Sequence, residues 1–396
     1  MENKNGCDES HASQMTRREA MERVALTGLG IATVLSGTDK VTSLAAQGVA
    51  PQVVLPDKDP RYPMPPAWPK QLKQLAPNVY AYTQGGGPGI PSVGVSNPGM
   101  IAGPDYMWAI DGTQGPMPAK AFIAACKQAT GKDFGRLLLT HHHGDHTGGL
   151  QFFQNTEVWS HPYCRQEVLK AVAATPKMWD PAAANPYGNI VDVVEPRKLV
   201  VPMLTFKDDM TVFIGDTEVR FMFAGPAHTW GDMMAYLPKQ KILFAGDVGF
   251  FWVAPFAQNG YVSKWIQSCD KIMGMDVDVI VPGHGPIGGK KELNEMADYF
   301  RTLTVEARKR YDAKMTPGAA AAEIRLGRFD NWIGTQLIIT DTVRLYDEWD
   351  GSLTPDVDTG RTMDATQEYN QIKKAQGKTS EMIPVEGLEH RLARSC

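Results

Sequence analysis

The sequence predicts an α+β protein, a four-layer αβ/βα sandwich with a C-terminal helical extension. Short runs with strand periodicity and interspersed helices occur twice, once before and once after a loop-rich stretch at 175–200. Helical patterns then dominate from 290 to 349. Two β-rich halves that each bury an apolar face favour two packed sheets with helices outside.

The composition fits a soluble globular protein. The chain has 396 residues, of which 43% are hydrophobic and 21% charged, which allows a large packed core. A formal net charge of −4 gives no basic surface for nucleic acid. The chain contains no run of 18 or more apolar residues, so no permanent membrane span is predicted. The five cysteines lack C-x-x-C spacing, so neither a zinc knuckle nor a disulfide framework is predicted, although one pair can still bridge.

Residues 1–50 are interpreted as an export leader. Arg17 and Arg18 precede a mildly apolar run at 24–36, and small residues at 43–46 offer a cleavage site, a pattern that resembles a twin-arginine signal. Met15 is an alternative start. The predicted location is the periplasm or the medium; an N-terminal amphipathic helix on a cytoplasmic protein is the alternative. Residues 51–75 are Pro-rich and predict a linker or an extended arm lying on the domain.

Residues 76–290 are predicted to form the catalytic domain, and 291–396 a helical extension and tail. The stretch 175–200 is a candidate lid, with a surface excursion as the alternative. No element is assigned after 350. Before the candidate lid the expected strands are 78–83, 92–98, 106–110, 137–140 and 157–160, with helices at 117–130 and 161–173. After it the expected strands are 204–206, 210–214, 218–223, 233–237, 241–244 and 277–281, with helices at 261–273, 290–311, 317–326 and 334–349.

The strand at 137–140 leads directly into a cluster of metal-capable side chains, His141, His143, Asp145 and His146. Imidazoles and a carboxylate are costly to bury together without a cation or a dense hydrogen-bond network. Neutral imidazole nitrogens and carboxylate oxygens are ligands that suit zinc and related ions. The cluster therefore predicts a metal site, with a solvated histidine-rich turn as the alternative. His142 is left out of the site.

Three later residues of the same chemistry, His228, Asp247 and His284, lie in Gly-rich turns just past predicted strands. Loops at strand ends are where a rigid scaffold presents functional groups, and glycine allows close approach of the backbone. We therefore expect all of these turns to converge on one site.

The ordered pattern H-x-H-x-D-H followed by His, Asp and His resembles the metallo-β-lactamase superfamily of hydrolases, over roughly 78–289. The resemblance implies the sandwich fold and two Zn²⁺ ions per chain, with iron or manganese as alternatives. It assigns the first metal to His141, His143 and His228. It assigns the second metal to Asp145, His146 and His284, with Asp247 bridging both.

Two divalent ions about 3.5 to 4 Å apart can share a water and lower its pKa, so the expected nucleophile is a bridging hydroxide. Asp145 is the candidate catalytic residue, because a free oxygen could orient the hydroxide and carry its proton to the leaving atom. Ring nitrogens that do not face a metal need acceptors, and Asp232 is a candidate for that role.

The bridging Asp247 resembles the thioesterase and lactonase branch, whereas lactam-cleaving members mostly carry cysteine or serine there. The predicted function is therefore hydrolysis of an ester, lactone, thioester or amide of a small, partly apolar substrate. The alternatives are a mononuclear-iron sulfur dioxygenase, a β-lactam hydrolase, and an exported metal-binding accessory protein without turnover. The basic run at 308–310 could hold glutathione as in thioesterases, or be a solvated helix face. The predicted substrate pocket uses Trp230, Phe250 and Trp252, with core packing as the alternative.

Overall fold

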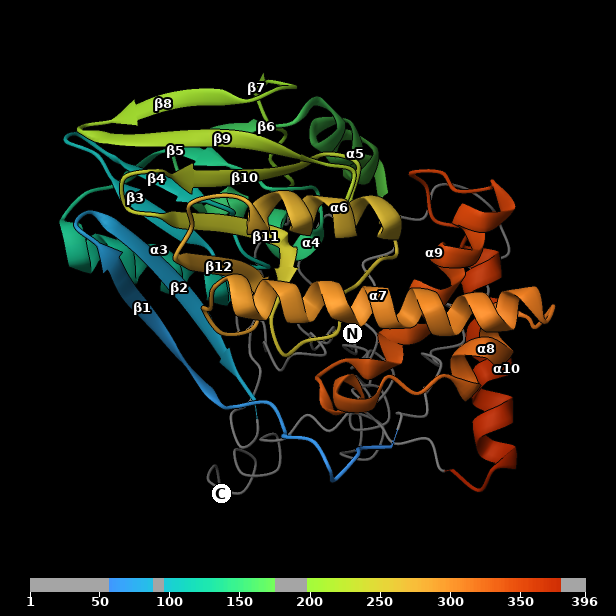
Figure 1. The fold of residues 1–396 in the computed structure, drawn as a ribbon. Helices are drawn as coiled ribbons and strands as arrows, with labels where there is room; N and C mark the ends of the chain where they lie inside the picture. The colour runs from blue at the N-terminus through green and yellow to red at the C-terminus, as the bar shows by residue number, and fades with distance from the viewer. Residues whose placement is uncertain (1–56, 88–95, 175–197, 379–396) are drawn as a thin grey trace, which may run out of the picture.

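The computed structural model describes residues 57–87, 96–174 and 198–378. The predicted export leader and most of the candidate lid lie outside these ranges. In the described part, two β-sheets pack face to face with helices on their outer faces, and further helices stand at one end (Figure 1). The αβ/βα sandwich predicted from the sequence is confirmed.

The first sheet has seven strands among the described residues, in the same order in space as in the chain. Its strands pair antiparallel from β1 to β4 and parallel from β4 to β7. The strands are β1 (Trp68–Ala76), β2 (Val79–Gly86), β3 (Gly99–Ala102), β4 (Met107–Ile110), β5 (Phe134–Leu138), β6 (Glu157–Ser160) and β7 (Leu204–Thr205).

Two boundaries predicted for this sheet were wrong. Most of β1 lies in the range 51–75 assigned to a linker, because β1 is an edge strand whose side chains are largely exposed and polar. Of the strand predicted at 92–98, residues 92–95 lie outside the described ranges and 96–98 are not in a strand; the next strand begins at Gly99. The residues before β1 do lie against the C-terminal extension as an arm: the Asn331 side chain donates to the carbonyls of Asp59 and Tyr62.

The second sheet has five strands in the described part of the chain, in the order β12-β11-β10-β9-β8. Only the β11–β12 pair is parallel, which puts the carboxyl ends of these two strands side by side. The strands are β8 (Met210–Ile214), β9 (Thr217–Gly225), β10 (Asp232–Leu237), β11 (Ile242–Phe250) and β12 (Val279–His284).

Alternating side chains separate the layers. In β4, Trp108 and Ile110 join the cluster between the two sheets, whereas Met107 and Ala109 join the cluster under the outer helices. Each large side chain buried in this way contributes about 1.5–3 kcal/mol. The outer helices on this sheet are α3 (Pro116–Thr130) and α5 (Pro162–Ala174).

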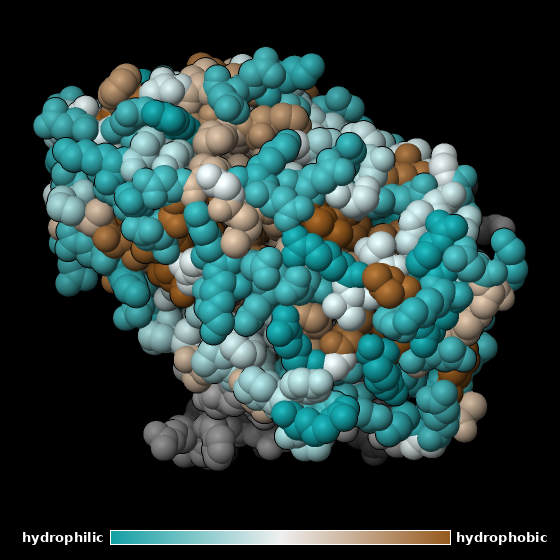
Figure 2. Space-filling view, in the orientation of Figure 1, coloured by the Kyte–Doolittle hydropathy of each residue, from teal (hydrophilic) through white to brown (hydrophobic). Residues whose placement is uncertain are grey.

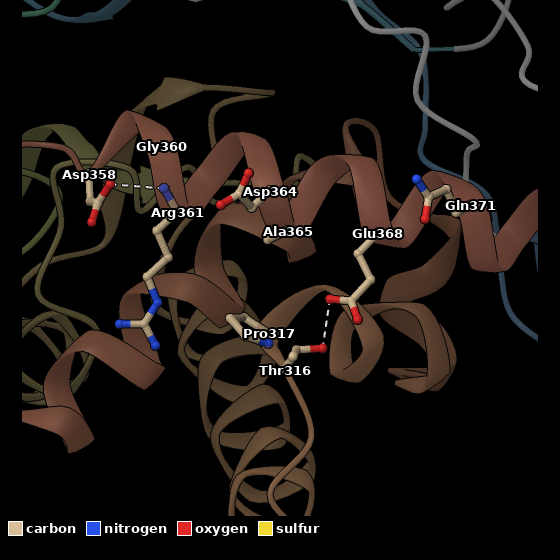
Figure 3. Close-up of a pocket in the computed structure, with 9 residues that line it drawn as sticks. All are labelled: Thr316, Pro317, Asp358, Gly360, Arg361, Asp364, Ala365, Glu368 and Gln371. Atoms are coloured by element: carbon tan, nitrogen blue, oxygen red, sulfur yellow. Dashed lines mark hydrogen bonds between the residues drawn. The ribbon is translucent and has the colours of Figure 1, made fainter.

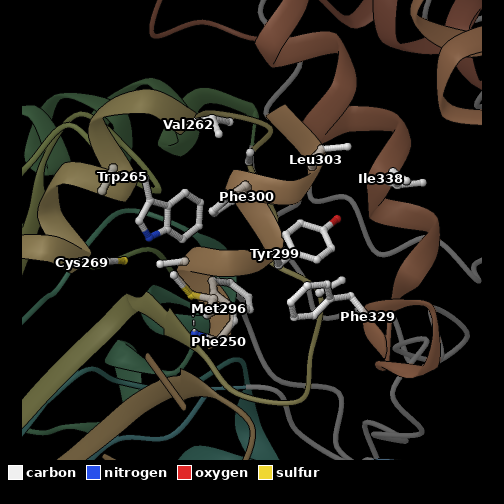
Figure 4. Packing of buried hydrophobic residues seen from close by; sticks show 14 of the residues in the cluster. Phe250, Val262, Trp265, Cys269, Met296, Tyr299, Phe300, Leu303, Phe329 and Ile338 are labelled. Carbon is white, nitrogen blue, oxygen red and sulfur yellow. Dashed lines mark hydrogen bonds between the residues drawn. The ribbon is translucent and has the colours of Figure 1, made fainter. Parts of the chain in front are cut away.

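The opposite face of the second sheet is covered by α6 (Val262–Met273) and α7 (Lys290–Asp312) (Figure 1). Trp265 of α6 packs on Phe300 of α7 with 4.9 Å between ring centroids, and Figure 4 shows the buried side chains around them. The same apolar cluster continues into the C-terminal extension through Phe329 and Ile338. The extension and the second sheet therefore share one core.

The extension consists of α8 (Pro317–Glu323), α9 (Ile338–Asp350), α10 (Thr359–Ala375) and the short helices η3 (Gly327–Asn331) and η4 (Thr335–Leu337). Helix α10 was not predicted because its pattern is mostly polar. It is held instead by a few buried groups, among them Tyr369 and Lys373, whose ammonium donates to the Ala322 carbonyl.

The visible surface in Figure 2 is largely hydrophilic, with hydrophobic residues scattered over it. None of the helices in the described ranges combines the length and the apolarity that crossing a bilayer requires. The three described cysteines, Cys126, Cys164 and Cys269, are free and buried.

Candidate metal centre

The seven side chains singled out from the sequence lie together in the turn after β5, in the loop after β9, within β11 and at the end of β12. Their ligand atoms form two groups, and within each group these atoms lie within 4.8 Å of one another. The first group is His141, His143, His228 and Asp247. The second group is Asp145, His146, Asp247 and His284. Asp247 belongs to both, so the two groups adjoin.

The turn after β5 is closed by its own backbone. His143 begins the short helix α4 (Gly144–Thr147), and its carbonyl accepts from the N–H groups of His146 and Thr147. The glycine that follows leaves no room for a side chain, because a Cβ at Gly148 would lie 1.9 Å from the Gln114 carbonyl oxygen. Farther along the chain, a Cβ at Gly283 would lie 1.8 Å from Asp247 Oδ1, so only glycine leaves room for that carboxylate.

The ligand atoms have mainly one another as polar neighbours. His141 Nε2, His146 Nε2 and Asp247 Oδ1 are buried without a well-aligned hydrogen bond among the described residues, although His146 Nε2 lies 3.0 Å from Asp247 Oδ1. Two imidazole nitrogens, His143 Nδ1 and His228 Nε2, face each other at 2.7 Å. Buried polar atoms are nearly always paired, and converging nitrogen and carboxylate atoms are the donor set of a divalent cation such as zinc. The residues present therefore fit a metal site.

Three of the opposite ring nitrogens have partners, whereas His228 Nδ1 has none among the described residues. His146 Nδ1 lies 2.8 Å from Asp111 Oδ2, His141 Nδ1 lies 3.0 Å from Thr140 Oγ1, and His143 Nε2 lies 3.0 Å from Asn259 Oδ1. Such contacts orient a metal-binding imidazole and fix its tautomer. A second layer of side chains, which does not face the metal site, thus orients these three imidazoles through hydrogen bonds.

Sequence reasoning missed this layer. Asp111, which directly follows β4, adopts a positive φ of 65° and accepts from Thr140 N–H and Oγ1–H. The prediction that Asp232 accepts from a ligand histidine was wrong. Its carboxylate accepts instead from the backbone N–H and the hydroxyl of Thr229. It therefore shapes the turn that carries His228. A signal for Asp111 existed, since an aspartate ends the strand that pairs with the motif strand.

The two groups differ in charge, because the second contains two carboxylates and the first only one. Burial alone would raise the pKa of Asp247, but the charges of His284, His146 and His228 hold that pKa well below its ordinary value. Burial opposes a charged His284, yet Asp247 and Asp145 outweigh it and raise the pKa of His284 to about 9. Burial lowers the pKa of His228 to about 3. In the metal-free chain, protons therefore gather in the second group, beside both carboxylates.

The predicted pocket residues lie in different surroundings. Phe250 is only 3% exposed and stacks on His284 with 4.6 Å between ring centroids, so it packs in the core behind the ligands. This corrects its assignment to the pocket. Trp230 and Trp252 are half-buried, beside Tyr261 and Trp332 respectively, and their role in a pocket stays a prediction.

The basic run at 308–310 is a charged face of α7 whose residues pair with acids on the same helix, Glu306 and Asp312. A hollow of about 670 Å³ lies between α8 and α10 (Figure 3). It is lined by polar side chains such as Arg361 and Glu368, and by none of the seven ligand residues.

Comparison with known proteins matches residues 110–284 to the Metallo-beta-lactamase superfamily. A linear primary-alkylsulfatase from Pseudomonas sp. (strain ATCC 19151) is 21% identical over 227 residues, which are 50% of this chain and 43% of that protein. A type 2 metallo-beta-lactamase from Bacillus sp. (strain 170) is 22% identical, covering 71% of this chain and all of that protein. The acyl-coenzyme A thioesterase MBLAC2 of Gallus gallus is 27% identical over 41% of this chain and 60% of that protein.

Among solved structures, the inverting sec-alkylsulfatase Pisa1 from Pseudomonas sp. shares the fold, with a TM-score of 0.55 and 18% identity over 71% of this chain and 50% of that chain. The chain thus spans less than half of the alkylsulfatase it matches in sequence and half of the one it matches in fold. The segment matched to the superfamily begins just before Asp111 and ends at His284, so it contains every residue of both ligand groups. Residues 110–284 of this chain, which carry both ligand groups, therefore match the Metallo-beta-lactamase superfamily.

Proposed function

We propose that the protein is a hydrolase with a two-ion centre, most simply two Zn²⁺, that cleaves an ester, lactone, thioester or amide of a small, partly apolar molecule. The observation that supports this is the position of Asp247 in both ligand groups, which provides four ligand atoms for each of two adjoining ions. Iron or manganese would suit the same nitrogen and oxygen donors.

Two divalent ions bound here would supply a water of lowered pKa and polarise the bond to be cleaved. The chain divides the remaining tasks between its carboxylates. The Asp247 side chain is 2% exposed, whereas that of Asp145 is 21% exposed. Asp145 is therefore the carboxylate that a substrate can reach, and we assign it the role of orienting the nucleophile and passing its proton to the leaving atom. His146 and His284, at 3.3 and 3.2 Å, hold the other side of this carboxylate.

A second candidate substrate class is an alkyl sulfate ester. It is favoured by the similarity to one alkylsulfatase in sequence and to another in fold. Carboxylic and sulfate esters place different charges at the reacting centre, so a single substrate panel distinguishes them.

The test combines metal analysis with a hydrolysis panel on the purified full-length chain. Elemental analysis is expected to give two zinc ions per chain. The panel contains nitrophenyl esters, lactones, thioesters, a chromogenic β-lactam and alkyl sulfates, and we expect turnover of the carboxylic or sulfate esters that a chelator abolishes. One iron per chain with oxygen uptake on a persulfide would instead establish the dioxygenase alternative. Two bound ions with no turnover across the panel would favour an accessory protein.

We also propose export through the leader at 1–50, which the paired Arg17 and Arg18 support. Cell fractionation tests this. The wild-type chain should reach the periplasm, and a variant with both arginines replaced by lysine should stay in the cytoplasm; equal distribution of the two would contradict export.

A further inference from the structure

Helix α9 of the C-terminal extension binds the backbone of the loop that connects β11 to α6. Three of its polar residues, at spacings of three and four, share one face of the helix. Ala257 N–H donates to Asp341 Oδ1 at 2.9 Å, and Ser263 N–H donates to Glu348 Oε1 at 3.2 Å. Between them, the Arg344 guanidinium donates to the Gly260 carbonyl at 2.8 Å. These contacts fix the loop at Ala257 and Gly260, and fix the first turn of α6 at Ser263.

Arg344 also fixes a second segment. The same guanidinium donates to the Thr354 carbonyl at 2.8 Å, in the connection between α9 and α10. Arg344 is buried, and Asp347 supplies a counter-charge at 3.7 Å. A buried charge is stable only with such partners, so the position of this side chain is well determined. Arg344 therefore fixes the position of the Gly260 carbonyl relative to the Thr354 carbonyl.

Asn259 lies next to the first of these carbonyls and Pro355 next to the second, and the two are joined. Asn259 Nδ2 donates to the Pro355 carbonyl at 3.2 Å, and Asn259 Oδ1 faces His143 Nε2 at 3.0 Å. A carbonyl can only accept, so the amide nitrogen must face Pro355 and the amide oxygen must face the histidine. His143 Nε2 then has to carry the proton.

The position of this proton decides whether His143 Nδ1 can bind a metal ion. With its proton on Nε2, a neutral His143 has a free lone pair on Nδ1, which is the nitrogen that faces His228 in the first ligand group. His141 and His146 differ, because their second nitrogens meet Thr140 and Asp111, which belong to the sandwich itself. Of these three histidines, only His143 is oriented through the extension.

We propose that the C-terminal extension sets the tautomer of His143 through Asn259, and so prepares the first ligand group for its ion. Asn259 is then a positioning residue, and Arg344 and Pro355 act through it. The effect on metal binding rests on the proposed function, whereas the effect on the tautomer concerns the metal-free chain and is independent of it.

The experiment compares full-length variants by long-range ¹H–¹⁵N spectra of ¹⁵N-histidine-labelled, metal-free protein, and by zinc titration. The wild type should show His143 protonated on Nε2. Asn259→Leu should lose this single tautomer and bind one of two zinc ions about 10- to 100-fold more weakly, the usual effect of removing such a contact. Asn259→Asp keeps an acceptor and should keep the tautomer. Arg344→Lys keeps the charge but loses the forked geometry, and should give a mixture of tautomers.

Asn294→Leu is the matched control, because Asn294 is a half-buried asparagine of α7 that bonds only to neighbouring surface groups in the described structure. It should behave as the wild type in both assays, and thermal unfolding checks that all variants are folded. The proposal is overturned if Asn259→Leu keeps the Nε2–H tautomer and both zinc affinities. An effect of Asn259→Leu with none in Arg344→Lys would overturn the part played by the extension. A wild type that binds no ion would refute the proposed function, and the tautomer spectra would still decide this inference.

Discussion

Asp111 orients His146 of the second ligand group through a hydrogen bond. Asp111→Asn is therefore the most informative single substitution for testing how the ligand imidazoles are oriented. The Asp111 side chain is buried and accepts from Thr140 N–H at Oδ1, and from Thr140 Oγ1–H and His146 Nδ1–H at Oδ2. An asparagine of the same shape has one acceptor oxygen and one NH₂ group. Whichever way the amide turns, its NH₂ group faces a donor: in place of Oδ1 it faces Thr140 N–H, and in place of Oδ2 it faces both Thr140 Oγ1–H and His146 Nδ1–H.

The magnitude follows from that count. A buried donor left unpaired costs about 1–3 kcal/mol. If the oxygen stays with Thr140 N–H, then His146 and the Thr140 hydroxyl lose their acceptor, and the affinity for the second ion should fall about 10- to 100-fold. If the oxygen stays with His146, the same cost appears as lost stability of the metal-free fold. In either orientation, the loss of binding free energy and the loss of stability should together amount to about 1–3 kcal/mol for each donor left unpaired.

The assay is zinc titration against a competing chelator, together with urea unfolding of the metal-free chain. Asp209→Asn is the control, because Asp209 also accepts a backbone N–H, from Phe223, but is exposed and belongs to no ligand group. It should change neither measurement. If Asp111→Asn binds two zinc ions as the wild type does and is equally stable, the orienting role of Asp111 is refuted.

Three further changes test other parts of the site. Asp247→Ala should reduce bound zinc below two per chain and lower kcat by orders of magnitude while the circular dichroism spectrum is retained; unchanged turnover would exclude bridging. Phe250→Ala should lower the free energy of unfolding by about 3–5 kcal/mol, as expected for a core aromatic ring, and a loss under 1 kcal/mol would return Phe250 to the pocket. Burial raises the pKa of Asp341 from 3.8 to about 8, so the folded state holds this proton more tightly than the unfolded state does. The stability of the wild type relative to Asp341→Asn should therefore fall as pH rises from about 4 to about 8, by at most about 1.4 kcal/mol per pH unit, and a flat difference would contradict this.

The sequence was most informative where the residues of the site are close together in the chain. His141 to His146 follow one buried strand within six positions, and glycines mark the turns of the later residues, so convergence could be predicted without coordinates. The edge strand β1 and the helix α10 were missed for the opposite reason: most of their side chains face solvent, and the apolar periodicity that identifies a strand or a helix is weak.

The second layer of the site could not be predicted because it depends on distance across the fold. Asp111 lies 35 residues from His146, and Asn259 lies 116 residues from His143. Asp232 looked like a partner for His228 because it is near in sequence, yet its carboxylate is already used by Thr229. Which polar residue stands behind which imidazole is decided by strand pairing and loop packing, which single-sequence patterns do not encode.

The shared core of the second sheet and the extension has a practical consequence for anyone shortening this gene. The segment matched to the superfamily model ends at 284, but Trp265 and Phe250 are packed against side chains from α7 and beyond. A fragment ending there would leave those aromatic rings in water, and we expect it to aggregate on expression. The smallest fragment worth producing therefore extends through α10.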